Sequence, residues 1–304
     1  SDITTTAGDL NITAGRRVYQ RDSDLTSSAQ MFVTSNGASI TGARSQSVNY
    51  MKYDSAGSVE IYDGYGRNPL LKSTAGSVDV ISANSHIDTR RATIDANRYV
   101  LLDARNNLAL QTDSTAKART LDTTLRAGVG GHIYYRYGTN VSAGRDVRMN
   151  SRNNIYIHGR TLTAARDIIS SSRAQVEVYN DGTARAALNS GRNITVNSTQ
   201  GRILTRKSDW IAGTGNISIN AGTHSVECWD GATGSTPGSF AARSGNWSGR
   251  GVRLMGMPIT ASSIHLGSGT GHILLEPNAD LTATTGGITI ASAGRYYQRD
   301  ADVV

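Results

Sequence analysis

The chain repeats one short phrase along its length, and this repeat restricts the folds that it can adopt. The phrase is a turn of small or polar residues ending in Gly, Asn or Asp, followed by an apolar–any–apolar triplet. Copies occur at 7–12, 56–61, 75–80, 105–110, 152–157, 191–196, 214–219 and 285–290. A phrase that recurs in this way predicts a repeat architecture, in which neighbouring repeats stabilise one another.

The spacing of the apolar triplets predicts the shape of one repeat. A triplet returns after one full repeat, as Ile168 follows Val147 and Ile217 follows Ile194. A second triplet lies within each repeat, as Ile203 follows Ile194, and the remainder has room for a third strand. We therefore expect an all-β solenoid, a right-handed parallel β-helix of about 14 coils of 21–24 residues. At about 4.8 Å per coil, such a helix would be a rod on the order of 65 Å long.

The repeat predicts a single β-helical domain over residues 1–304, and we expect it to be a piece of a longer protein. Two regions break the rhythm and are predicted to be irregular inserts, at about 40–72 and 223–250. In the second region, the step from Ile217 to Val252 is half a coil too long for one repeat. An echo also links residues 14–24 with residues 293–302, which share the order Ala-Gly-Arg, Tyr-Gln-Arg-Asp.

Composition agrees with short strands and tight turns, with 33 Gly, 4 Pro and 2 Phe. No apolar stretch approaches the roughly 20 residues that a membrane-spanning helix needs. The single Cys228 excludes an internal disulfide.

Net charge is +7, but the Arg residues are scattered along the chain, so we expect no nucleic-acid partner. Two interpretations of the positive charge stay open: a solvated face of the solenoid, or attraction to acidic glycans, lipopolysaccharide or a membrane surface.

Several phrases resemble filamentous haemagglutinin repeats, among them Ala-Gly-Asp-Leu-Asn-Ile-Thr-Ala-Gly at 7–15, Ser-Ala-Gly-Arg-Asp-Val-Arg-Met at 142–149 and Ser-Gly-Arg-Asn-Ile-Thr-Val at 190–196. Such repeats belong to large exoproteins of bacterial two-partner secretion, which include adhesins and the stick proteins of contact-dependent growth inhibition. The resemblance implies a right-handed β-helix, passage through an outer-membrane transporter, and a secreted or cell-surface location. It also implies a role in adhesion, virulence or effector presentation.

Enzymes also use the parallel β-helix, so catalytic and metal-binding patterns bear on function. A glycosidase needs convergent carboxylates, but the steps between Asp88, Asp95 and Asp103 are much shorter than a coil and do not repeat at its period. His265 and His272 lack a carboxylate or Cys partner at ligand spacing. We therefore expect no enzyme activity, no catalytic or metal site and no cofactor.

Aromatic side chains are the candidates for contact with a partner, because Tyr and Trp are favoured at interfaces and can stack on sugar rings. The candidates are Tyr50, Tyr53, Tyr62, Tyr65, Tyr134, Tyr135, Tyr137, Trp229 and Trp247. The sequence thus favours the shaft of a secreted bacterial surface protein that binds a receptor or glycan on a target cell. A polysaccharide-degrading enzyme and a phage or injection-machine spike are the alternatives.

Overall fold

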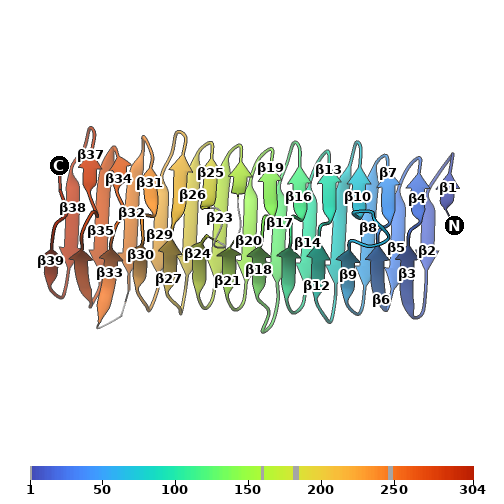
Figure 1. Ribbon diagram of the computed structural model, residues 1–304, viewed down its shortest axis with the longest axis horizontal. Coiled ribbons are helices and arrows are strands. Elements are labelled where there is room, and N and C mark those ends of the chain that lie inside the picture. The colour runs from blue at the N-terminus through green and yellow to red at the C-terminus, as the bar shows by residue number, and fades with distance from the viewer. Residues whose placement is uncertain (1, 159–160, 181–184, 246–248) are drawn as a thin grey trace. The chain divides into compact units, whose positions relative to one another are not determined.

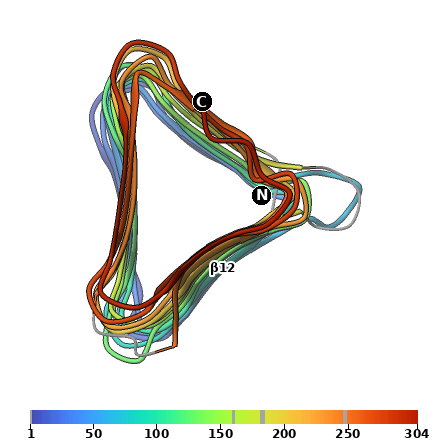
Figure 2. The ribbon, with the colours of Figure 1, turned by 90° about the vertical axis from the view of Figure 1, so that its left-hand side faces the viewer.

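The computed structural model describes residues 2–158, 161–180, 185–245 and 249–304, which contain strands and turns but no helix (Figure 1). Contacts divide the chain into two compact units, Ser1–Arg152 and Asn153–Val304. Both units are built from the same coil of three strands, and each strand pairs in parallel with its counterpart one coil on. Followed by colour in Figure 2, the coils of either unit trace a three-sided outline. The predicted parallel β-helix is confirmed.

The three sides of the first unit are named faces A, B and C, in the order in which the chain visits them. Face A contains β1 (Ile3–Thr5), β4 (Asp24–Ser27), β7 (Arg44–Ser47), β10 (Leu70–Ser73), β13 (Thr93–Ala96), β16 (Thr115–Ala118) and β19 (Asn140–Ala143). Face B contains β2 (Leu10–Thr13), β5 (Met31–Ser35), β8 (Tyr50–Ser55), β11 (Ser77–Ser82), β14 (Val100–Ala104), β17 (Thr123–Ala127) and β20 (Val147–Ser151). Face C contains β3 (Arg17–Arg21), β6 (Gly37–Thr41), β9 (Val59–Tyr62), β12 (Ile87–Arg90), β15 (Leu108–Gln111) and β18 (Ile133–Arg136).

The second unit has the same three faces. Face A contains β22 (Thr161–Ala164), β25 (Ala186–Ser190), β28 (Ser208–Ala212), β31 (Thr233–Ser235), β34 (Ile259–Ala261) and β37 (Leu281–Ala283). Face B contains β23 (Asp167–Ser172), β26 (Asn193–Ser198), β29 (Ile217–Ala221), β32 (Ser239–Ser244), β35 (Ser263–Ser268) and β38 (Ile288–Ser292). Face C contains β21 (Ile155–His158), β24 (Val176–Tyr179), β27 (Ile203–Arg206), β30 (Val226–Trp229), β33 (Arg250–Leu254), β36 (His272–Leu275) and β39 (Tyr296–Gln298).

Each face therefore has 13 strands among the described residues, one fewer than the 14 coils expected from the sequence. No helix in that part of the chain is long and apolar enough to cross a membrane.

Alternation along each strand decides which side chains enter the core. In β26, Ile194 and Val196 are fully buried, whereas Thr195 between them faces outward and is partly exposed. The same register places Ile217 and Ile219 above them one coil on. Since every inward position stacks on an inward position of the next coil, the core of each unit is a continuous apolar column.

The Asn or Asp of the repeated phrase has a specific structural role. Its side-chain oxygen accepts the backbone N–H of the matching residue in the next coil: Asn216 donates to Asn193 at 2.9 Å, and Ser239 donates to Asn216 at 2.7 Å. In the first unit, Asp146 donates to Asp122 at 3.2 Å in the same way. The phrase thus extends the backbone ladder into the turn, where strand hydrogen bonds stop.

The corner between faces C and A is the sharpest turn of the coil. Residues with left-handed backbone recur there, including Arg91 with φ of 46° and Lys207 with φ of 42°. A single residue in this conformation reverses the chain within a very short link. Because the left-handed region costs a side chain free energy, we attribute its repeated use to the tightness of this corner.

The expected insert at 40–72 is mostly regular, because β6 to β10 continue all three faces. The departure is confined to residues 63–69, a longer turn at the corner between faces C and A. This turn reaches back along the unit, where Arg67 binds Asp22 at 3.0 Å and Asp24 at 2.7 Å.

Much of the expected insert at 223–250 continues the regular coil among the described residues. Phe240 pairs with Ile217 in parallel register, so the chain between them is one ordinary coil. The rest of the distance to Val252 is the step from face B to face C, which is longer than the step from Ile264 to Ile273 and includes residues 246–248, outside the described residues. The sequence conceals this because Phe240 is followed by Ala241 and Ala242 rather than by branched apolar residues.

The largest core side chain provides a test of this packing. Trp210 is fully buried in β28 and its Nε1 donates to Ser208 Oγ at 3.0 Å, whereas its neighbour Ile211 is 47% exposed. We expect Trp210→Ala to lower the free energy of unfolding by about 3–5 kcal/mol, since it removes the indole and leaves a cavity. Ile211→Ala is the matched control and should stay within about 0.5 kcal/mol of the parent in urea unfolding.

The side-chain ladder provides a second test. Asn216→Ala removes the acceptor of the Ser239 N–H and should lower the free energy of unfolding by about 1–2 kcal/mol. Thr195→Ala, on an outward position of the same face, should have a much smaller effect. Equal unfolding midpoints for the two variants would contradict a stabilising ladder.

Candidate functional site

Two of the aromatic candidates lie inside the core, which corrects their expected role as partner contacts. Tyr53 and Tyr135 are fully buried, so their side chains are not available to a partner. The Tyr53 hydroxyl lies 2.6 Å from Ser45 Oγ and donates to Gln20 at 3.0 Å. Burial explains this arrangement, because a buried hydroxyl needs hydrogen-bond partners. The sequence conceals it, since alternation identifies an inward position only after the register is known.

The other candidates are distributed over several surfaces. Tyr62, Tyr134 and Trp229 face outward on face C, and Tyr50 lies at the start of a face B strand. Tyr65 and Tyr137 are 63% and 55% exposed at the corner between faces C and A, both with left-handed backbone. Trp247 lies outside the described residues. The structure therefore does not bring all candidates into one site.

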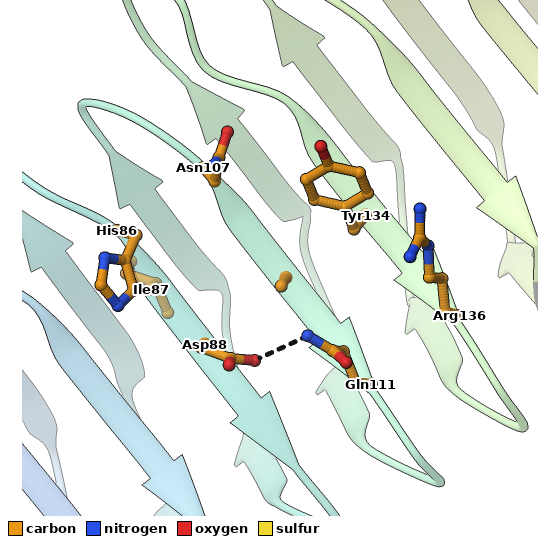
Figure 3. Close-up of a pocket in the computed structure, with 8 residues that line it drawn as sticks. His86, Ile87, Asp88, Asn107, Gln111, Tyr134 and Arg136 are labelled. Atoms are coloured by element: carbon orange, nitrogen blue, oxygen red, sulfur yellow. Dashed lines mark hydrogen bonds between the residues drawn. The ribbon is translucent and has the colours of Figure 1, made fainter.

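A hollow of about 340 Å³ lies on face C of the first unit, where Tyr134 is one of its walls. Its floor is Ala109 on β15, which is only a methyl group between the longer outward side chains of Asp88 on β12 and Tyr134 on β18. Figure 3 shows the hollow with the residues that line it: His86, Ile87, Asp88, Asn107, Ala109, Gln111, Tyr134 and Arg136. One small residue in a column of long ones thus creates the depression.

Asp88 organises one side of this hollow. Its Oδ1 accepts a hydrogen bond from Gln111 Nε2 at 3.1 Å, the dashed contact in Figure 3, and its Oδ2 accepts the Tyr62 hydroxyl at 2.8 Å. Burial and the Asp88 carboxylate both raise the pKa of Tyr62, which keeps this hydroxyl protonated as a donor. The three side chains connect three successive coils and hold this wall in a fixed shape.

The ring of Tyr134 contacts two neighbouring side chains. It stacks on His132 with centroids 5.6 Å apart, and the Arg136 guanidinium lies over it at 4.6 Å. These side chains cover part of the ring, so less of it is open to a sugar than in a tyrosine without such neighbours.

Trp229 in the second unit follows the same pattern. The guanidinium groups of Arg206 and Arg253 lie 4.7 and 4.5 Å from its ring. Cation–π contacts of this kind connect neighbouring coils and stabilise the stack. On face C the aromatic residues thus brace the solenoid, and the groups that remain for a ligand are the polar side chains beside them.

The residues considered for catalysis or metal binding are separated. Asp88 lies on face C, Asp95 on face A and Asp103 on face B, so the three carboxylates point in different directions. His265 on face B and His272 on face C are separated in the same way. Among the described residues no group of three or more His, Cys, Asp or Glu could hold a metal ion. The hollow on face C is suited to hydrogen bonding of a ligand.

Arg–Asp pairs between adjacent coils give the protein a predictable response to acid. Hydrogen bonds from Arg145, Arg192 and Arg185 lower the pKa of the Asp122, Asp167 and Asp209 carboxyl groups, respectively. A carboxyl whose pKa is lowered by folding stabilises the fold above its unfolded value of about 3.9, and this contribution is lost as the pH falls through the folded pKa.

We therefore expect the free energy of unfolding to decrease as the pH falls below about 4. The variant Asp122→Asn, Asp167→Asn, Asp209→Asn should show a weaker decrease, because these positions no longer titrate. Urea unfolding followed by circular dichroism between pH 6 and pH 2 measures the difference. The same pH dependence in the variant and the parent would contradict a role for these pairs.

Comparison with known proteins adds no family assignment. No protein-family model matches the sequence, and no curated protein or solved structure shows a significant match to it.

Proposed function

We propose that this chain is a structural and adhesive segment of a large secreted bacterial surface protein, which presents or binds a target away from its own cell. The observation that supports the proposal is the coil itself: each coil adds length through the same parallel ladder, and the outward positions are free to vary. The resemblance of the repeated phrase to filamentous haemagglutinin repeats agrees with this function. An outer-membrane transporter during export and a receptor or glycan on the target cell are the partners that the proposal requires.

The hollow on face C gives the adhesive part of the proposal a location. Ala109 forms its floor and is buried, yet its side chain lies on the outward side of β15, not in the core. Leu204 and Leu274 occupy the corresponding column in the second unit. A larger apolar residue is therefore compatible with this column, so Ala109→Leu can fill the hollow without disturbing the core.

Binding of the labelled whole chain to bacterial and host cells tests the proposal. We expect saturable binding that excess unlabelled chain displaces, and we expect Ala109→Leu to weaken it severalfold while the unfolding midpoint stays unchanged. Ala241→Leu makes the same change on an outward position of face B and serves as the control.

Three results would contradict the proposal: no saturable binding to any cell type, release of oligosaccharides from acidic polysaccharides, or a tight trimer by mass measurement. The second result would favour a polysaccharide-degrading enzyme, and the third would favour a spike.

A further inference from the structure

Two tyrosines stand on alternate coils at the start of face B in the first unit, with a small residue between them. Tyr50 is in register with Ser77, and the backbone N–H of Tyr99 lies 3.5 Å from Ser77 Oγ. Adjacent strands are about 4.8 Å apart, so the backbones of the two tyrosines are separated by roughly 10 Å, while their side chains lean toward one another and share a hydrogen bond. A hollow of about 460 Å³ opens at this point, lined by Gln30, Asn49, Tyr50, Ala75, Gly76, Ser77, Arg98 and Tyr99.

Tyr50 is held in place before any ligand arrives. Its ring meets Phe32 in a T-shaped contact with centroids 5.8 Å apart, and its hydroxyl donates to Asp79 Oδ2 at 2.6 Å. Burial is the main reason that the pKa of both Tyr50 and Tyr99 is raised, and Asp79 adds to it. A fixed aromatic wall loses little conformational entropy when a ligand packs against it.

Asp79 holds the two rings in place from below. The residue is 7% exposed and lies on β11, between the strands of Tyr50 and Tyr99. Burial raises the pKa of its carboxyl, and hydrogen bonds from the side chains of Tyr50 and Tyr99 oppose that rise. The carboxyl group therefore anchors both tyrosines, while the walls of the hollow are formed by other residues.

Arginine side chains lie beside the tyrosines, together with the Asp79 and Asp122 carboxylates. Arg98 lines the hollow, is exposed and forms no ion pair with any described residue. On the other side of Tyr99 lies a second hollow of about 340 Å³, whose walls include Arg126 and Arg145. Arg145 is bound to Asp122 at 2.7 Å, whereas Arg126 is 3.8 Å from Asp103. Arg98 is therefore available to an anion, and Arg126 is held only by this longer ion pair.

We propose that these two hollows, which share Tyr99 as a wall, bind one strand of an acidic polysaccharide that lies across the coils of face B. Sugar rings pack beside Tyr50 and Tyr99, and the carboxylate or sulfate groups of the glycan face Arg98 and Arg126. Aromatic walls with converging polar groups are the usual composition of ligand sites in this range of volume. The inference rests on the proposed adhesive function and adds to it a ligand class and a second site, on face B, besides the hollow on face C.

Calorimetric titration of the whole chain with oligogalacturonate, with a sulfated oligosaccharide and with a neutral xylo-oligosaccharide of equal length tests the site. The acidic oligosaccharides should bind, and their affinity should fall as salt is raised because the charges are exposed. Tyr99→Ala should weaken binding about tenfold, and Arg98→Gln severalfold with a smaller salt dependence. The two acidic ligands distinguish a carboxylate from a sulfate as the preferred anion.

Matched controls separate the site from general effects. Tyr19→Ala removes an exposed tyrosine of face C, and Arg105→Gln removes an exposed charge at the far end of a face B strand. Both should bind the acidic oligosaccharides as the parent does. Tyr99→Leu serves as a second variant if Tyr99→Ala alters the unfolding midpoint.

Equal affinity for the neutral and acidic ligands would overturn the inference, and so would unchanged affinity in Tyr99→Leu and Arg98→Gln. Cell binding that is unchanged in these variants but weakened by Ala109→Leu would also overturn it while leaving the proposed function intact. Absence of cell binding by the parent chain, with oligosaccharide binding retained, would overturn the proposed function alone.

Discussion

The parallel hydrogen-bond ladder between successive coils is the interaction on which the rest of this structure depends. A coil of this length cannot bury its own apolar residues, so its stability comes from the coils before and after it. The ladder continues through the turns because Asn193 and Asn216 accept backbone N–H groups with their side chains. The repeated phrase therefore encodes a contact between repeats.

Sequence periodicity predicted much of the fold because the ladder requires it. Branched apolar residues must recur at the coil period if each is to stack on the next, as Ile194 and Ile217 do. Periodicity failed where another residue fills the same position, as Phe240 does before two alanines. It also missed the left-handed corner at Arg91 and Lys207, because neither residue type signals that conformation.

The candidate sites were harder to predict because they depend on register between coils. Residue type alone does not distinguish Tyr53 from Tyr134, yet Tyr53 is in the core and Tyr134 lines a surface hollow. The hollow on face C exists because Ala109 falls between Asp88 and Tyr134, which lie a full coil before it and a full coil after it. Only the register shows that a small residue stands between two large ones, and the same holds for the serine between the two tyrosines of face B.

The turn at 63–69 shows that the coil can change in length without losing its order. Val59 and Ile87 remain partners in the ladder, although the coil between them is longer than the coils on either side of it. The additional residues leave the stack at one corner, where Arg67 fastens them to two carboxylates of an earlier coil. This corner is therefore a natural place for peptide grafting: a foreign loop inserted there would be displayed at the side of a scaffold whose strands keep their partners.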